Sequence, residues 1–296
     1  MSKELSSPHY LNLAKTLVHT VHETLGRTRD LKSRLPGATD TSPLSGGLRI
    51  GKEDETGDDC DGQYFHYSAL WMYALNRLSI ATGESYYNNH AIVLAKATHS
   101  AFVYLRNSSR PRMAWKMSVG LDHALVRSEG NLDPIDGYVV FSLLQDTDGS
   151  TELKDEMAEY KKILDTKWEG YSSDDPSDVG MTLWTAHFFD GEAEWATALM
   201  KSAEKSVEEL YGGNGGLLKQ SIKDRLAFRE FGSALGIRCS KNSEIGTYAE
   251  QIVKVWEDDG RVPVPISRDM KSMEPIDCVM YVASLVPGAF IRGYLQ

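Results

Sequence analysis

The stretch YFHYSALWMYALNRLSIATGES, residues 64–85, predicts how this chain folds. Apolar side chains recur along it every three or four residues, which is typical of a helix running from Tyr64 to Thr82. Gly83 ends that helix, because glycine adopts the left-handed backbone of a helix C-terminus without strain. A second helical pattern follows from Ser85 to Leu105, so the stretch predicts a helical hairpin with a short turn.

The helical period continues over the rest of the chain. Further helices are predicted near residues 10–25, 134–145, 151–164, 179–189, 192–211, 224–235, 245–256 and 275–285. The alternation typical of strands is not sustained, although Leu48–Ile50 and Val262–Ile266 could each make a short extended piece. The sequence therefore predicts an all-α protein, with five to six helical hairpins forming an (α/α) toroid in a single domain, residues 1–296.

A long polar stretch, residues 26–62, separates the first two predicted helices. It contains Pro36, Pro43 and the pair Gly46–Gly47, which break regular structure. Because a loop of this length in a compact domain is usually functional, we expect it to close over a site as a lid.

Composition limits the partners of the chain. The net charge of −10 and the absence of a long Lys/Arg run argue against a nucleic-acid partner. No stretch has the apolar length of a membrane span, and MSKELSS at the start lacks the apolar core of a signal peptide. Cys60, Cys239 and Cys278 are widely spaced, which predicts free thiols. We expect a cytoplasmic protein with a small-molecule substrate and with no metal or other cofactor.

Three carboxylates, Asp58, Asp59 and Asp61, precede the aromatic helix. Two interpretations stay open. In the first, Asp61 caps the helix and His66 is a core histidine. In the second, Asp59, Asp61 and His66 line a pocket and perform acid–base chemistry, because capping needs only one carboxylate.

A second carboxylate pair, Asp133 and Asp136, flanks Pro134. Proline at the first helical position makes Asp133 the predicted N-cap, and Asp136 then lies where the helix dipole favours negative charge. The alternative is that both carboxylates face a cleft. The catalytic candidates are Asp59, Asp61, His66, Asp133 and Asp136.

Substrate-binding candidates are polar or aromatic side chains near these acids or in other clusters. Arg225 and Arg229 share a helix face, where they can bind a carboxylate, a phosphate or a polyol, or pair with Glu230. The full set is Lys52, Gln63, Tyr67, Trp115, Lys116, His123, Trp184, His187, Arg225 and Arg229.

Six stretches resemble an uncharacterised family of bacterial and fungal proteins that is similar to the six-hairpin, glycosidase-like (α/α) toroid superfamily. They are GGLRIGK (46–52), DGQYFHY (61–67), WKMS (115–118), DPIDGY (133–138), LAFRE (226–230) and VMYVASLVPGAF (279–290). That superfamily includes glycoside hydrolases, polysaccharide lyases and sugar epimerases or isomerases, with sites in the central cleft. The resemblance therefore implies chemistry on a carbohydrate.

The leading hypothesis is an enzyme that acts on a small polyhydroxylated substrate. Glycoside hydrolysis would use a carboxylate pair, for which Asp61 and Asp136 are the candidates. An epimerase or isomerase would use histidines as acid and base, drawing on His66, His123 and His187.

Two alternatives belong to other classes. The sequence DDCD, residues 58–61, resembles the Asp-rich acid motif of terpene cyclases, in which a buried Asp with a raised pKa protonates an apolar substrate. This hypothesis is a terpenoid or polyketide cyclase or isomerase of secondary metabolism. The other is a non-catalytic binding protein on the same scaffold.

Overall fold

The computed structural model describes residues 7–57, 59–130, 132–263 and 273–295. By its internal contacts the chain divides into two compact units, residues 1–166 with 295–296, and residues 167–294. The described residues contain ten α-helices and only a few short strands, which confirms the all-α expectation. The single toroid domain stays a prediction.

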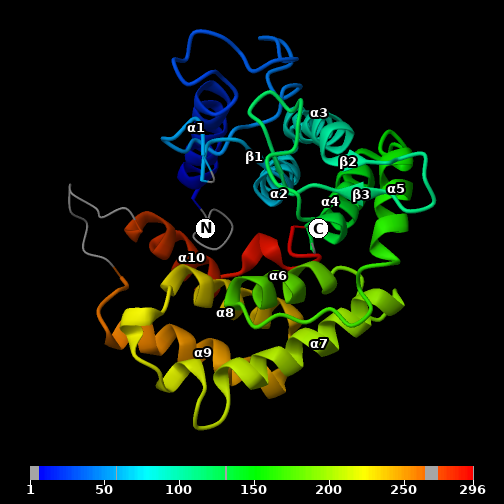
Figure 1. Cartoon of the computed structure of the whole chain (residues 1–296). Coiled ribbons are helices and arrows are strands. Elements are labelled where there is room, and N and C mark those ends of the chain that lie inside the picture. The colour runs from blue at the N-terminus through cyan, green and yellow to red at the C-terminus, as the bar shows by residue number, and fades with distance from the viewer. Residues whose placement is uncertain (1–6, 58, 131, 264–272, 296) are drawn as a thin grey trace. The chain divides into compact units, whose positions relative to one another are not determined.

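The first unit is built from five helices (Figure 1). They are α1 (His9–Thr24), α2 (Phe65–Thr82), α3 (Ser85–Phe102), α4 (Asp133–Asp148) and α5 (Lys154–Leu164). Helix α2 packs on α3 and α4, and α4 packs on α5. Gly83 adopts φ 73°, so the predicted hairpin turn between α2 and α3 is confirmed.

Two antiparallel strand pairs were not predicted. Strand β1 (Gln63–Tyr64) pairs with β4 (Lys116–Met117), and β2 (Val103–Tyr104) pairs with β3 (Arg112–Met113). A strand of two residues is too short for alternation to be detected.

The expected extended piece Leu48–Ile50 is not part of a strand. A hydrogen bond from the Ile50 N–H to the Gly62 carbonyl, at 2.8 Å, holds its backbone. Of the other expected piece, Val262 and Pro263 are not in a strand, and residues 264–266 lie outside the described residues.

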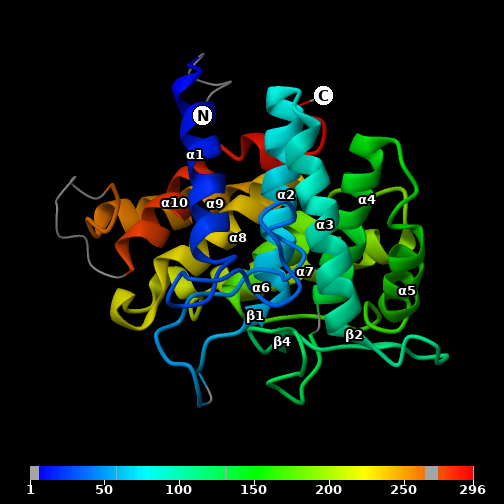
Figure 2. The same ribbon diagram turned by 90° about the horizontal axis from the view of Figure 1, so that it is seen from above.

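Both strand pairs lie at one end of the first unit. Strand β1 directly precedes α2 and β2 directly follows α3, so the α2–α3 hairpin places them together, as Figure 2 shows. An isolated bridge between Ala114 and Glu129 brings the residues before α4 to the same end. The chain thus gathers strands, loops and two helix N-termini where the predicted site residues are densest.

The second unit has two rows of helices. They are α6 (Pro176–Ala186), α7 (Glu194–Tyr211), α8 (Ala227–Ser240), α9 (Ser243–Asp258) and α10 (Glu274–Leu285), with short 3-10 helices at Leu217–Lys219, Ile222–Asp224 and Gly288–Phe290. Helix α8 packs between α6 and α10, and α7 packs on α9 (Figure 1). Glycine permits the α6–α8 contact, because a Cβ on Gly180 would lie 2.2 Å from the Gly232 carbonyl oxygen.

The predicted helix positions agree with all ten observed helices, although their ends shift by up to five residues. Residues 26–62 form no helix and no strand where they are described. Their role as a lid stays a prediction. Within the described part of the chain, no helix has the length and apolar character to cross a membrane.

Candidate functional site

Asp61 anchors the loop before α2. It is 2% exposed, and its Oδ2 is ion-paired with Arg49 Nη1 at 3.1 Å and with Arg29 Nη1 at 3.2 Å. Its Oδ1 accepts three backbone N–H groups, those of Gly51 at 2.9 Å, Lys52 at 3.2 Å and Gly62 at 3.0 Å. The predicted cap is wrong: Tyr64 is the N-cap of α2 and no side chain caps that helix. Asp61 instead ties three parts of the loop together.

Gln63 has a similar structural environment. It is fully buried, and its Oε1 accepts the Leu48 N–H at 2.8 Å. Its Nε2 donates to the carbonyls of Gly46 and Val119, both at 2.8 Å. The side-chain amide therefore holds the Gly46–Leu48 turn against the loop that follows β4.

Tyr64 is the centre of an aromatic and basic group that we call the Tyr64 cluster. Its ring centroid lies 5.4 Å from those of Trp115 and Tyr67 and 5.8 Å from that of His66. The ammonium groups of Lys52 and Lys116 lie over the same ring, at 5.5 and 5.4 Å. Five predicted site residues thus meet at Tyr64, which was not itself among the candidates. Its signal was the aromatic density of residues 64–67.

His66 is the histidine of the Tyr64 cluster. His66 is partly exposed, and its ring centroid lies 4.4 Å from that of Tyr67. Its imidazole makes no hydrogen bond to any of the described residues. Burial lowers the pKa of His66 to about 4, because the imidazolium would lose its hydration. The ring is therefore neutral at neutral pH and can accept a proton.

The two lysines of the cluster differ in exposure. Lys116 is 2% exposed. Lys52 is about one-third exposed and pairs with Asp59, whose side chain is 84% exposed. Asp59 therefore lies on the surface, and Asp58 falls outside the described residues. The Trp115 indole donates to Ser128 Oγ at 2.9 Å, which fixes one ring of the cluster.

Asp133 and Asp136 are buried at the start of α4, where they are 8% and 2% exposed. The predicted capping role of Asp133 is wrong, because the helix includes Asp133 and Leu132 is its N-cap. The Asp133 carboxylate packs on Gly130, where an added Cβ would lie 1.8 Å from Oδ2. Both carboxylates belong to the end of the first unit that carries the Tyr64 cluster.

His123 lies on the surface of the first unit. Its side chain is 64% exposed, and Nδ1 lies 2.8 Å from Asp122 Oδ1. Asp122 in turn is held by Ser118 Oγ in a short hydrogen bond within the same turn.

Arg225 belongs to the core of the second unit. Its guanidinium donates from Nε and Nη2 to Glu230, at 2.7 and 2.5 Å, and both side chains are 2% exposed. The Trp256 indole donates to Glu230 Oε2 at 3.1 Å and also lies under the Arg225 guanidinium. This prediction of pairing with Glu230 is confirmed for Arg225.

Arg229 joins two helices of the second unit. It is ion-paired with Asp175, the N-cap of α6, and its side chain is 43% exposed. Burial raises the pKa of the neighbouring Asp178, and the negative charge of Asp175 raises it further. Sequence reasoning missed both acids, although Asp175 directly before Pro176 is typical of a helix start.

His187 and Trp184 are adjacent at the end of α6. His187 Nδ1 contacts the Trp184 carbonyl, and Nε2 accepts the Arg292 N–H at 3.0 Å. Burial lowers the pKa of His187 to about 4. Trp184 is 3% exposed and packs edge-on against Phe188. Both imidazole nitrogens therefore have structural partners.

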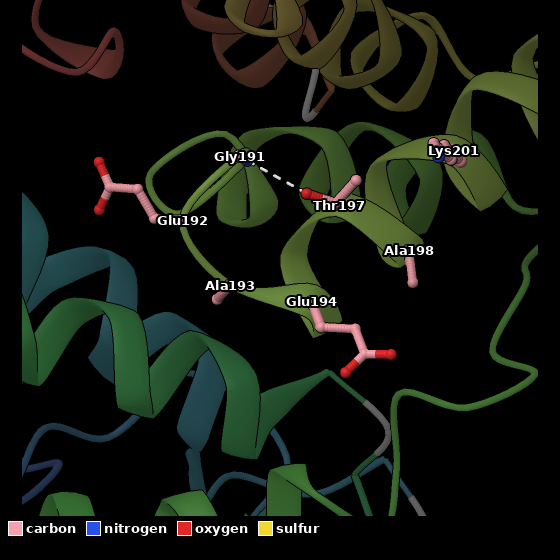
Figure 3. Close-up of a pocket in the computed structure, with 7 residues that line it drawn as sticks. All are labelled: Gly191, Glu192, Ala193, Glu194, Thr197, Ala198 and Lys201. Carbon is pink, nitrogen blue, oxygen red and sulfur yellow. Dashed lines mark hydrogen bonds between the residues drawn. The ribbon is translucent and has the colours of Figure 1, made fainter.

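A hollow of about 430 Å³ lies at the start of α7 (Figure 3). Its wall is tied by the Gly191 N–H, which donates to Thr197 Oγ at 3.1 Å. Glu192 at its edge is ion-paired with Arg292 at 2.7 Å. None of the predicted site residues lines this hollow.

No group of three or more His, Cys, Asp or Glu side chains among the described residues is placed to hold a metal ion. Comparison of the chain with protein-family models, curated proteins and solved structures gives no match. The resemblance to the toroid superfamily therefore stays a prediction.

Proposed function

We propose that this chain is an enzyme that acts on a small polyhydroxylated, sugar-like substrate by acid–base chemistry, as an epimerase or isomerase. The observation that carries the proposal is the His66 imidazole, which is neutral, partly exposed and without a hydrogen bond to the described residues. A general base needs an unprotonated nitrogen that a substrate can reach.

The Tyr64 cluster supplies the other groups that this chemistry needs. The rings of Tyr64 and Trp115 suit the apolar face of a sugar ring. His66 takes the proton from the carbon beside the substrate carbonyl, and the carbonyl oxygen gains the negative charge. The ammonium of Lys52, which is about one-third exposed and lies over the Tyr64 ring, stabilises that charge. His66 gives the isomer when it returns the proton to the neighbouring carbon and the hydroxyl proton passes to the former carbonyl oxygen. The epimer forms when a second acid, such as a water molecule, protonates the original carbon from the opposite face.

The histidine route is favoured over glycoside hydrolysis by the environment of Asp61. Hydrolysis with Asp61 and Asp136 requires both carboxylates to reach the substrate. Asp61 already accepts hydrogen bonds from two guanidinium groups and three backbone N–H groups. The same contacts argue against Asp61 as the proton donor of a cyclase.

The (α/α) toroid remains our proposed arrangement for the whole chain. It is supported by the pattern inside each unit, because hairpin helices of such a fold alternate between two rows. Helices α6, α8 and α10 pack in one row and α7 and α9 in another. In the first unit, α2 packs on α4 in the same alternate manner.

Hydrogen exchange in heavy water tests the proposal. The protein is incubated in D2O with a panel of aldoses and ketoses, and proton NMR follows the loss of the C–H signal beside the carbonyl. We expect exchange with at least one sugar, and a loss of about 10²-fold or more in His66→Gln. His9→Gln is the matched control, because His9 is an exposed histidine at the start of α1. Exchange with no sugar, or exchange unchanged in His66→Gln, contradicts the proposal.

A further inference from the structure

A second cavity of the first unit lies apart from the Tyr64 cluster. It has a volume of about 460 Å³, within the range of small-molecule sites. Its walls come from the second half of α1, from the first turns of α3 and from four loop residues, Arg34, Asp40, Thr41 and Pro43. None of the residues of the Tyr64 cluster lines it.

Two parallel imidazoles, those of His22 and His90, form part of its wall. Their planes differ by 3° and their centroids lie 5.8 Å apart. His22 is 4% exposed, and its Nε2 lies 3.2 Å from the Trp71 indole N–H, which donates to it. A neutral imidazole carries one N–H, so in His22 that proton is on Nδ1. His22 therefore offers a hydrogen-bond donor.

His90 carries its proton on the same nitrogen as His22, but its other nitrogen is the one left for a ligand. Its Nδ1 lies 3.0 Å from the Tyr86 carbonyl oxygen, which can only accept, so Nδ1 carries the proton. The remaining nitrogen, Nε2, is an acceptor. Burial lowers the pKa values of both rings, that of His22 to about 4 with a contribution from His90 and Arg34. Both imidazoles are therefore neutral at neutral pH, each with its proton on Nδ1.

The charges around the cavity cancel. Lys15 is paired with Glu84 at 2.5 Å. Arg34 and Arg27 share the two carboxylates Glu23 and Asp40, so the three positive charges at the cavity face three negative ones. An anion or a cation would meet no net opposite charge there. The lining polar groups therefore favour a neutral ligand that both donates and accepts hydrogen bonds.

We propose that this cavity binds a neutral polyol of monosaccharide size. A hydroxyl group both accepts and donates, so neighbouring hydroxyls can accept from His22 Nδ1 and donate to His90 Nε2. The Tyr86 ring, 4.2 Å from that of His90, offers an apolar face beside them. This site is independent of the acid–base chemistry at His66.

Binding of myo-inositol tests the site. This polyol has no carbonyl group, so it cannot undergo the proton transfer proposed at His66, and the two proposals can fail separately. Nitrogen-15 NMR of the histidine-labelled full chain follows the imidazole signals during titration. We expect saturable shifts for His22 and His90, and binding weakened about tenfold in His90→Phe, which keeps a ring but removes the acceptor. His9→Phe is the matched control and should bind as the unmodified chain does.

Trp71→Phe tests the site without changing a lining side chain. It keeps an aromatic ring but removes the N–H that fixes the His22 tautomer. We expect the nitrogen-15 spectrum to show loss of the Nδ1–H tautomer together with weaker myo-inositol binding. The proposal is overturned by no saturable shift in the unmodified chain, by an Nε2–H tautomer of His22 there, or by inorganic phosphate producing the same shifts in place of myo-inositol.

Discussion

Asp61 and His66 lie five residues apart in the sequence, and both were candidates for acid–base catalysis. Their surroundings are opposite. Asp61 is 2% exposed and receives five hydrogen bonds or ion pairs from the protein, whereas His66 is partly exposed and has ring contacts alone among the described residues. A polar group whose bonding capacity is used inside the protein stabilises the fold. A polar group whose donors or acceptors have no partner in the protein can hydrogen-bond a ligand.

The largest effect is expected when Asp61 loses its charge. Asp61→Asn leaves the guanidinium groups of Arg29 and Arg49 without their shared carboxylate, and Arg49 is only 7% exposed. Removal of one partner from a buried ion pair typically costs about 3–5 kcal/mol, and we expect about 4 kcal/mol here. Urea unfolding followed by circular dichroism measures the change.

The matched control is Asp59→Asn. Asp59 pairs with Lys52 at the surface, where its side chain is 84% exposed, so solvent screens the pair. The free energy of unfolding should change by less than about 0.5 kcal/mol. Equal losses in the two variants would refute the structural role that we assign to Asp61.

The second unit offers a further buried carboxylate with which to sharpen the comparison. Glu230→Gln leaves the buried Arg225 guanidinium, whose side chain is 2% exposed, without its counter-charge. The Glu230 carboxylate accepts three hydrogen bonds from side chains, whereas the Asp61 carboxylate receives five hydrogen bonds or ion pairs. We therefore expect a smaller loss, about 3 kcal/mol, by urea unfolding. A loss below that of Asp59→Asn would contradict this reasoning.

The helices could be predicted from the sequence because their signal is local. Gly83 and the apolar spacing of residues 64–82 lie within one segment, and the helix follows from them. The two-residue strands could not be predicted, because a strand of that length is defined by its partner, as β1 is by β4.

The same reason explains the candidate site. Aromatic density drew attention to residues 64–67, but Trp115 and Lys116 reach Tyr64 only through the pairing of β1 with β4. The partners of Asp61 are equally remote, since Arg29 lies 32 residues earlier in the chain. Without those contacts the sequence could not separate a structural aspartate from a catalytic one.

Acid should weaken the fold through its buried histidines. Burial lowers the pKa of His99 to about 3, with a contribution from the Arg106 charge, while the unfolded chain keeps a value near 6.5. Between those values the unfolded state binds the proton and the folded state does not. The stabilisation is therefore complete above pH 6.5 and is lost as pH falls toward 3.

The variant His99→Phe should reduce this acid sensitivity. We expect the fall in unfolding free energy between pH 7 and pH 4 to be smaller by about 2 kcal/mol than in the unmodified chain. Urea titrations at each pH measure it, and His9→Phe, which changes an exposed histidine, should leave the pH dependence as it is. An unchanged slope in His99→Phe would mean that Glu159, 3.3 Å from Nε2, already accommodates the protonated ring.

The smallest change in stability is expected at His66. His66→Phe removes no hydrogen bond to a described residue and keeps an aromatic ring against Tyr64 and Tyr67, so unfolding in urea should change by less than about 1 kcal/mol. The same variant has no nitrogen to carry a proton, so hydrogen exchange on the substrate should disappear. A loss of stability close to that of Asp61→Asn would make His66 a core histidine and remove the contrast between the two residues. Retained stability with lost exchange would make the unused hydrogen-bonding capacity of His66 the mark of its function.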